Sequence, residues 1–314
     1  MAKTTEIIAP DETGFRKAAG LLRAGGLVAM PTETVYGLAG DACDDEAVAR
    51  IFEAKARPTF NPLIIHLPDV SAVSQWAELD EQASTLAAAF WPGPLTMVLP
   101  IRANTGLSSL ITAGLSTVAV RVPAHESAKA LLRAFGGPLA APSANPSGKI
   151  SPTTAAHVLA GLDGKIDAVL DAGPCNVGVE STIIGLDAKP TLLRPGGLST
   201  EDIEAALGAP LQLRDQREAI NAPGQLASHY APKAVLRLNA LATDPGERLL
   251  GFGDVSCALN LSPAGDLVEA AANLFRYLHQ LDETDGPIAV SPIPDTGLGR
   301  AINDRLRRAA APRP

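Results

Sequence analysis

Short apolar segments alternate with helical segments along the 314-residue chain, and this alternation constrains the fold more than any other feature. Residues 15–22 carry apolar side chains at i, i+3, i+4 and i+7, the spacing of an amphipathic helix, and Gly25-Gly26 ends that helix. Leu27–Met30 follows as a short buried strand. Repetition of this order of helix and strand predicts an α/β fold, in which helices pack on a sheet.

The same periodicity assigns further elements and divides the chain into two domains. In the first part, strands are expected at 63–67, within 91–100, and at 117–123, 138–141, 168–171, 181–186 and 191–193, with helices after Asp44 or Asp45 and at 80–90, 124–135 and 200–207. In the last part, strands are expected near 235–238, 248–252, 257–261 and 287–291, with helices at about 266–281 and 297–310. We therefore predict a larger domain at 1–208, a linker at 209–233, where the pattern weakens, and a small Rossmann-like α/β domain at 234–314.

Composition excludes several classes of protein. A net charge of −8 and an aromatic content of 4% argue against an extended nucleic-acid surface or base-stacking platforms, though not against local basic pockets. Three cysteines, Cys43, Cys175 and Cys257, lie far apart without CxxC spacing, which fits neither a disulfide framework nor a zinc site. We expect no signal peptide and no membrane-spanning segment, and hence a cytoplasmic location.

The segment KARPTFNPLIIH, residues 55–66, brings two cations, an amide and a histidine close together. Lys55 and Arg57 close a helical pattern, Asn61 follows in a turn, and His66 ends an apolar strand. One interpretation is a solvated helix end, because the helix dipole favours cations in the last turn. The other is a binding site for an anionic, hydrogen-bonding ligand.

Arg121 ends the apolar strand TVAVRVP and is expected to be buried or half-buried, so it needs an anionic partner. Two interpretations stay open from the residues alone. The guanidinium forms an internal ion pair with a nearby carboxylate, or it binds the carboxylate of a ligand in a bidentate manner.

The loop PSANPSGKISPT, residues 142–153, combines hydroxyls, an amide, a glycine and Lys149, a composition able to surround phosphates, although such a segment taken alone is more often just a loop. The turn RPGG, residues 194–197, repeats the pattern of a cation beside a tight turn. The sequence contains no GxxxxGK[ST], GxGxxG, GxSxG or HExxH motif, so neither a P-loop nor a common hydrolase site is indicated. We assign no nucleophile, general base or metal-binding side chain. His125 and His157 fall in helical patterns and are interpreted as surface residues.

Several motifs together resemble one family. PTETVYGL, AKARPTFNPLIIH, FWPGPLTMVL, TVAVRVP, APSANPSGKISPT, GVESTII and LLRPG occur in the order and spacing of the YrdC-like domain. PGQLASHYAPK in the linker and GLGRAINDRLRRAA near the end are similar to the longer, two-domain L-threonylcarbamoyladenylate synthases. The resemblance implies a twisted, open mixed sheet with helices around a concave cavity, followed by the small C-terminal domain.

The resemblance also implies a reaction and its partners. Such synthases join L-threonine, bicarbonate or CO2, and ATP with Mg2+, release diphosphate, and form threonylcarbamoyl-AMP. A partner transferase complex passes the product to the adenosine next to the anticodon in certain tRNAs, so direct tRNA contact is possible. The Mg2+ ion would be held mainly by phosphates rather than by protein carboxylates.

By motif, the resemblance carries over two groups of site residues. Those expected around threonine are Thr34, His66, Arg121, Ala141 and Ser181. Those expected around ATP are Lys55, Arg57, Asn61, Thr117, Ser143, Asn145, Ser151, Arg194, His229 and Tyr230, of which the last two come from the linker. His66 is expected to bind substrate rather than to act as a general base.

Two other functions compete with this prediction. One is a non-catalytic module that binds double-stranded RNA on the same concave surface, and the other is the carbamoyl transfer of hydrogenase maturation. The second domain, the linker motif and the net charge of −8 favour the synthase over the RNA-binding module. The count of three cysteines excludes the zinc fingers that normally accompany the carbamoyltransferase.

Overall fold

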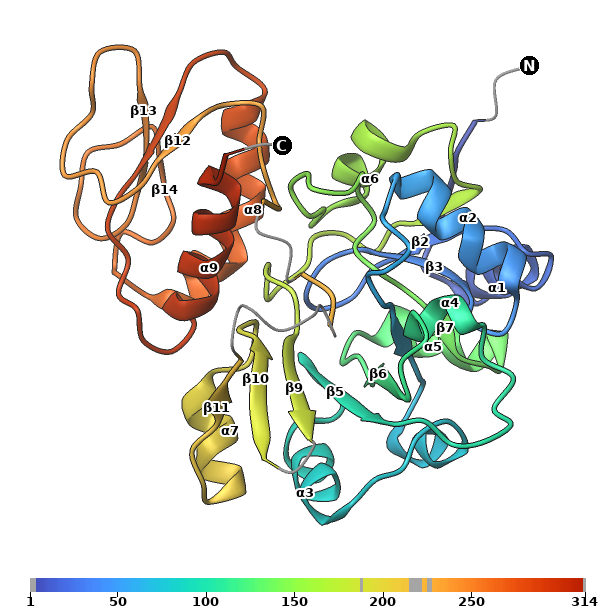
Figure 1. The fold of residues 1–314 in the computed structure, drawn as a ribbon. Helices are drawn as coiled ribbons and strands as arrows, with labels where there is room; N and C mark the ends of the chain where they lie inside the picture. The colour runs from blue at the N-terminus through green and yellow to red at the C-terminus, as the bar shows by residue number, and fades with distance from the viewer. Residues whose placement is uncertain (1–3, 187–188, 215–221, 225–227, 313–314) are drawn as a thin grey trace.

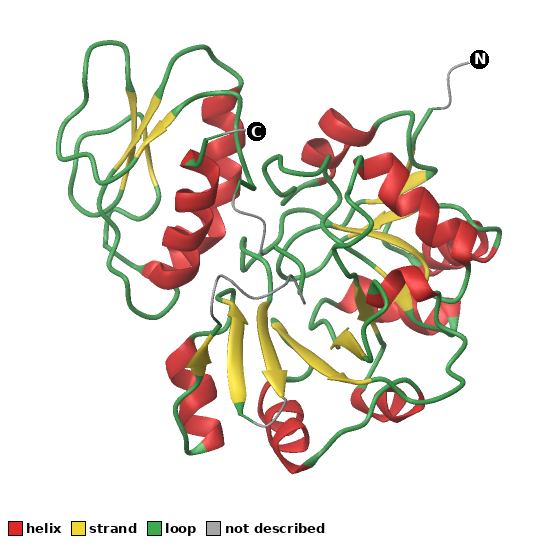
Figure 2. Cartoon of the chain, in the orientation of Figure 1, coloured by secondary structure: helices red, strands yellow, loops and turns green. Residues whose placement is uncertain are grey.

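The protein folds into two α/β units, as the sequence predicts (Figures 1 and 2). The computed structural model describes residues 4–186, 189–214, 222–224 and 228–312. Within these ranges the larger unit is built on a mixed sheet of 11 strands and the smaller on a sheet of four strands. No helix in the described ranges is both long and apolar enough to cross a membrane.

The large sheet determines where the polar strand ends meet. Its strands lie in the order β1 (Glu6–Ile8), β8 (Ala168–Leu170), β2 (Val28–Met30), β3 (Gly37–Asp41), β7 (Leu139–Ala140), β4 (Ile64–His66), β6 (Thr117–Arg121), β5 (Leu95–Pro100), β9 (Thr182–Leu186), β10 (Pro190–Arg194) and β11 (Gln212–Leu213). β4 pairs with β6 in parallel, β5 pairs with β6 antiparallel, and the register puts His66 and Thr96 on either side of Arg121. Three polar side chains thus occupy one row across the middle of an apolar sheet.

Helices cover this sheet. They are α1 (Glu12–Arg23), α2 (Asp45–Lys55), the 3-10 helix η1 (Val70–Gln75), α3 (Glu81–Phe90), α4 (Ser109–Thr112), α5 (Glu126–Phe135), α6 (Ala155–Leu162) and α7 (Thr200–Leu207). Asp44, one of the two caps expected, accepts hydrogen bonds from the first-turn amides of α2, and Ala56 ends that helix in the left-handed conformation. This abrupt end turns the chain after Lys55 toward β4.

The small unit has an all-parallel sheet in the order β12 (Leu236–Arg237), β15 (Ile288–Val290), β13 (Arg248–Gly251) and β14 (Leu259–Asn260). Its two helices are α8 (Leu267–Asp282) and α9 (Gly299–Ala310). Both helices lie on the side of the small sheet that faces the larger unit (Figure 1). Residues of both helices contact the larger unit.

One apolar cluster joins the two units. Val35, Ile150 and Val179 of the larger unit are buried in the same cluster as Leu274 and Phe275 of α8. Gly178 beside them has φ +75°, and a Cβ atom there would lie 2.4 Å from a backbone oxygen of α8. Only glycine allows this close approach, so α8 is fixed against the loop that leads into β9.

Two histidines also meet in this interface. The rings of His157 on α6 and His279 on α8 are stacked with centroids 3.9 Å apart, and His279 Nε2 lies 3.2 Å from the Ser151 carbonyl oxygen. The surface interpretation of His157 is therefore wrong, because α8 covers its ring. His125 caps α5, where its Nδ1 accepts from the Ser127 amide.

The boundary between the larger domain and the linker differs in one detail from the sequence-based division. β11 pairs in parallel with β10, so residues that fall within the expected linker extend the large sheet. Residues 215–221 and 225–227 of that linker lie outside the described residues. The domain boundaries themselves stay a prediction.

Candidate functional site

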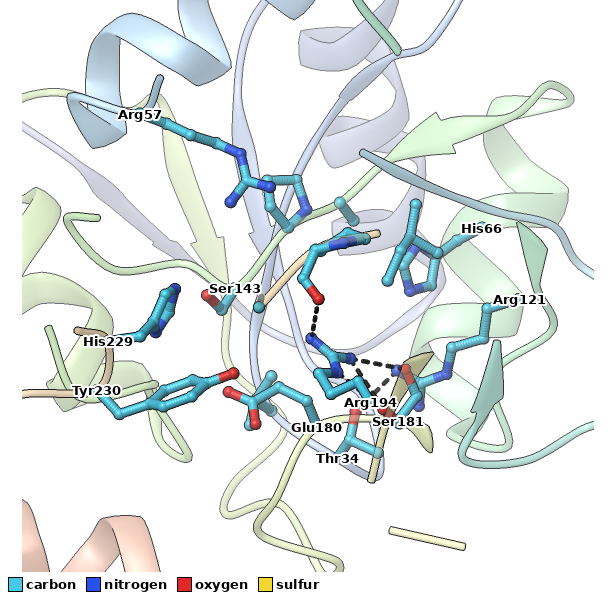
Figure 3. Close-up of a pocket in the computed structure, with 16 residues that line it drawn as sticks. Thr34, Arg57, His66, Arg121, Ser143, Glu180, Ser181, Arg194, His229 and Tyr230 are labelled. Atoms are coloured by element: carbon cyan, nitrogen blue, oxygen red, sulfur yellow. Dashed lines mark hydrogen bonds between the residues drawn. The ribbon is translucent and has the colours of Figure 1, made fainter. Parts of the chain in front are cut away.

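A small polar cavity lies where the ends of β4, β6 and β9 meet the loop after β7 and the described part of the linker. Its volume is about 50 Å³. Figure 3 shows side chains from these separate segments converging on it. Ten of the 15 residues expected at the site line the cavity: Thr34, Arg57, His66, Arg121, Ala141, Ser143, Ser181, Arg194, His229 and Tyr230.

Arg121 forms the internal ion pair that was one of its two interpretations. Its Nη2 donates to Oε1 of Glu33 at 2.6 Å, its Nη1 donates to Oγ1 of Thr34 at 2.8 Å, and its Nε donates to the Gly93 carbonyl at 3.3 Å. Burial raises the pKa of Glu33, but the charge and hydrogen bond of Arg121 outweigh it and lower that pKa. Each Nη atom carries a second hydrogen, so a ligand carboxylate and Glu33 do not compete for the same N–H groups.

His66 is neutral and has a free ring nitrogen. Burial, together with the charge of Arg121, lowers its pKa to about 3. Its Nδ1 has no hydrogen-bond partner among the described residues. Next to this end of the cavity, the hydroxyls of Ser181 and Thr96 are hydrogen-bonded at 2.7 Å. A neutral imidazole and a pair of hydroxyls suit a small polar ligand that offers both donors and acceptors.

Two further arginines face the cavity from the other side. Arg57 donates to the carbonyls of Asn61 and Pro62, and burial followed by the charge of Arg194 lowers its pKa to about 10. Arg194 donates to the carbonyl and the hydroxyl of Ser181. Burial is also the main cause of the lowered pKa of Arg194. The charge of Arg194 thus disfavours the charge of Arg57, and an incoming anion would relieve this repulsion, so the two arginines form an anion site.

Lys55 does not line the cavity but supports its wall. It is 1% exposed, and its Nζ donates to the carbonyls of Ser143 and Asn145, the latter at 2.5 Å. Burial and the charge of Arg57 lower its pKa well below the usual value, against the opposing charge of Glu180. In this structure Lys55 therefore holds the loop that carries Ser143.

The other four expected residues also lie outside the cavity lining. Asn61 is 0% exposed, and neither its Nδ2 nor its Oδ1 has a partner among the described residues. Asn145 Nδ2 donates to the Pro146 and Lys149 carbonyls, which leaves its Oδ1 unpaired within the same ranges. Ser151 donates to Glu180, and Thr117 begins β6 at the opposite end from Arg121.

Glu180, Glu33 and Arg305 are buried residues of the site region that the sequence analysis missed. Glu180 is the one acidic residue among the described residues that line the cavity. Burial raises the pKa of Glu180, but the charges of Arg305 and Arg194, together with the hydrogen bonds that Glu180 accepts, lower it to about 2. Glu33 and Glu180 stand inside the motifs PTETVYGL and GVESTII, and Arg305 inside GLGRAINDRLRRAA, so the signal was present in segments already singled out.

Two linker residues close the cavity. His229 and Tyr230 both line it, their rings lie 4.0 Å apart, and the Ala231 amide donates to the Gly148 carbonyl at 2.8 Å. The cavity volume of about 50 Å³ is far below the roughly 300–1,000 Å³ of typical ligand pockets. A ligand larger than a few waters therefore requires these linker residues to move.

Comparisons with known proteins match both units. A Sua5, YciO and YrdC family model described as "Telomere recombination" matches residues 20–196. A second model, described as "Threonylcarbamoyl-AMP synthase, C-terminal domain", matches residues 198–311. The threonylcarbamoyl-AMP synthase of Bacillus subtilis is 42% identical, over 98% of this chain and 96% of that protein. The threonylcarbamoyl-AMP synthase of Pyrococcus abyssi is 43% identical, over 96% of this chain and 95% of that protein.

A solved structure resembles the whole arrangement. The crystal structure of P. abyssi Sua5 complexed with L-threonine superposes with a TM-score of 0.90 at 41% sequence identity. The match covers 98% of both chains, so it includes both units and their relative placement.

Proposed function

The chain belongs to the threonylcarbamoyl-AMP synthase family, and from this premise we propose how its cavity holds the substrates. The protein joins L-threonine, bicarbonate or CO2, and ATP into L-threonylcarbamoyl-AMP and releases diphosphate. The observation that carries the site assignment is the convergence of three arginines and a neutral histidine on one cavity. This arrangement suits the alignment of several anionic reactants.

Threonine occupies the end of the cavity formed by β4, β6 and β9. The second N–H groups of Arg121 bind the threonine carboxylate. The hydroxyl of Thr34 accepts from the guanidinium and orients it, and the hydroxyl of Ser181, bonded to that of Thr96, lines the wall beside it. His66, which is neutral, hydrogen-bonds the substrate through its unpaired Nδ1. The Ala141 backbone completes this end.

ATP occupies the cationic end. Arg57 and Arg194 bind phosphate oxygens, while Lys55 holds the loop of Ser143 and Asn145 in place. Threonine's amine adds to CO2 and releases a proton to form a carbamate, whose oxygen attacks the α-phosphorus as diphosphate leaves. The arginines stabilise the negative charge that develops during this displacement, and no protein nucleophile is needed. Asn61, Thr117, Ser151, His229 and Tyr230 remain proposed contacts of the nucleotide.

Mg2+ accompanies ATP in this proposal and is held chiefly by the phosphates. Within the described residues no group of three or more His, Cys, Asp or Glu side chains could hold a metal ion. Glu180, the acidic residue of the described lining, is bonded to Arg305 and Ser151. Phosphate and water ligands are what Mg2+ accepts most readily, and the ion would reduce the charge of the phosphates.

The described linker residues act as the cover of the nucleotide. His229 and Tyr230 fill space in the cavity, so they withdraw to admit ATP and return to exclude water from the adenylate. The compartment and the transferase complex that receives the product stay predictions, as does direct tRNA contact. The RNA-binding alternative is not favoured, because both family models and both synthase relatives match the chain.

One assay tests the proposed reaction. The protein is incubated with ATP, L-threonine, bicarbonate and Mg2+, and diphosphate is measured with and without threonine. Release of diphosphate that depends on threonine is expected. Folded protein that releases diphosphate equally in both mixtures would overturn the proposal.

A further inference from the structure

Helix α9 of the small domain carries a buried arginine that the reaction described above does not use. Arg305 is 0% exposed, its Nε donates to Oε2 of Glu180 at 2.7 Å, and its Nη1 donates to the Pro195 carbonyl at 2.8 Å. Nη1 also lies 2.8 Å from Oδ2 of Asp304 on the same helix. Because Glu180 and Pro195 belong to the larger domain, this one side chain connects the two domains at the cavity wall.

The connection is electrostatic and buried. Side chains of Arg305 and Glu180 are 0% and 8% exposed, respectively. Burial alone would raise the pKa of Glu180, and the charge of Arg305 is the largest cause that opposes it. The carboxylate is therefore ionised and oriented because α9 supplies the matching charge.

Glu180 in turn contacts groups at the nucleotide end of the cavity. It lines the cavity itself, and its Oε1 accepts from the hydroxyl of Ser151. Its neighbour Ser181 accepts from Arg194 through both its carbonyl and its hydroxyl oxygen. Thus the segment 180–181 links α9 to Ser151 and to one of the two arginines that face the phosphates.

Helix α9 also contacts the linker at the same place. The His229 amide donates to the Arg308 carbonyl at 3.2 Å. The guanidinium carbon of Arg305 lies 5.1 Å from the centre of the Tyr230 ring, within the range of a cation–π contact. Two cavity-lining residues of the linker are thereby held by the same turn of α9 that holds Glu180.

We propose that Arg305 is a positioning residue for the ATP half of the reaction, so that the nucleotide site in the larger domain is complete only when α9 is docked. Arg305 touches neither substrate. It acts by fixing the Glu180 carboxylate and the Tyr230 ring. Its hydrogen bonds among the described residues reach neither Arg121 nor His66, on which the threonine end is built. This inference rests on the proposed function for the identity of the two ligands.

The test compares the binding of the two ligands by calorimetry on the 314-residue chain. In Arg305→Met, the Kd of a non-hydrolysable ATP analogue is expected to rise by about tenfold or more, because displaced groups bind poorly. The Kd of L-threonine is expected to stay within about twofold, which also shows that the variant is folded. In turnover the same variant is expected to show a higher KM for ATP and a lower kcat, with an unchanged KM for threonine.

Arg300→Met is the matched control. Arg300 also lies on α9 and also pairs across the interface, with Oε1 of Glu201 at 3.1 Å, but these side chains are 38% and 46% exposed. Binding of the analogue and of threonine by this variant is expected to match that of the unmodified chain. A loss of analogue binding in Arg300→Met as large as in Arg305→Met would overturn the specific role of Arg305.

A second variant covers the case in which Arg305→Met does not fold. Arg305→Met combined with Glu180→Met removes both partners of the buried pair, and such replacements are commonly tolerated. This double variant is expected to bind threonine normally and the analogue weakly. Unchanged analogue binding in either folded variant, or an equal loss of both ligands, would overturn the proposal. Because the titrations need no turnover, a chain that binds the analogue but releases no diphosphate would contradict only the proposed function.

Discussion

The Arg121 guanidinium donates to the Glu33 carboxylate at 2.6 Å, and their side chains are only 4% and 11% exposed. This ion pair lies at the cavity end that we assign to threonine. Glu33 balances the charge of Arg121 while leaving N–H groups of the fork free for a second carboxylate. The cavity can therefore keep a buried arginine ready for substrate without an unpaired charge.

The first prediction concerns the stability that this pair provides. Glu33→Gln leaves the charge of Arg121 buried without its counter-ion, so the free energy of unfolding is expected to fall by about 3 kcal/mol. Urea unfolding measures this change. Glu12→Gln is the control, because Glu12 pairs with Arg16 at the surface, where the side chains are 84% and 66% exposed, and a loss below about 1 kcal/mol is expected. Equal losses in the two variants would mean that the buried pair is not needed for stability.

The second prediction separates the two ligands at Arg121. Removal of one partner of a buried charge pair typically costs at least about 2 kcal/mol, or about 30-fold in Kd. Arg121→Ala is therefore expected to raise the Kd of threonine by this factor or more, while the Kd of an ATP analogue stays within about threefold. Calorimetric titration of each ligand measures both constants, with the exposed Arg102→Ala as control. An equal loss of affinity for threonine and for the ATP analogue would show that Arg121 is structural.

Much of the fold follows from local periodicity, but some of it depends on long-range pairing. The helix expected at 200–207 is α7, with the same bounds, and the helix expected at 80–90 is α3, one residue shorter. In contrast, β3 (Gly37–Asp41) has the sequence GLAGD, which contains two glycines and no β-branched residue. It becomes a strand because β2 and β7 pair with it, and such long-range pairing leaves no local pattern.

The site was predictable to the extent that its residues stand at strand ends within motifs. His66 and Arg121 meet because β4 and β6 are neighbours in the sheet, and the resemblance to a family supplied the expectation that they would. The sequence did not reveal that Lys55 supports a loop from behind the cavity. Nor could it pair Glu180 with Arg305, which lies 125 residues further along the chain in another domain.

The third prediction uses the side-chain amide of Asn61, which has no hydrogen-bond partner among the described residues. A buried polar group without partners destabilises a fold by roughly 1–3 kcal/mol, so Asn61→Ala is expected to leave the Tm of the ligand-free chain unchanged or higher. If the amide serves ATP, the same variant is expected to lose about tenfold in affinity for an ATP analogue. Thermal unfolding with and without the analogue measures both effects.

Asn273→Ala is the matched control for this prediction. Asn273 is another buried asparagine, but its Nδ2 donates to the Leu261 carbonyl at 2.9 Å and its Oδ1 accepts from Arg276. Its removal is expected to lower the free energy of unfolding by about 1–3 kcal/mol without changing the affinity for the ATP analogue. A lower Tm in ligand-free Asn61→Ala with unchanged analogue binding would assign Asn61 a structural role instead.

The last prediction concerns pH and the histidine stack between the domains. Burial, followed by the charges of His279 and Arg276, lowers the pKa of His157 from 6.5 to about 4. Burial also lowers the pKa of His279, although the Ser151 carbonyl and the acidic side chains of Asp282 and Glu283 raise it. Both rings are therefore neutral in the folded protein at neutral pH.

The sign of the effect follows from proton binding. Between the unfolded pKa of 6.5 and the folded value of about 4, the unfolded chain binds more protons than the folded chain. The free energy of unfolding is thus expected to be unaffected by this pair above pH 6.5 and to fall as the pH falls through that window. His279→Gln keeps a hydrogen-bond donor for the Ser151 carbonyl but cannot be protonated. The Tm of this variant is expected to decline less between pH 7 and pH 5 than that of the unmodified chain. The difference in Tm between the two chains at pH 8 is the reference. Equal declines would contradict a role for the stack in the loss of stability at low pH.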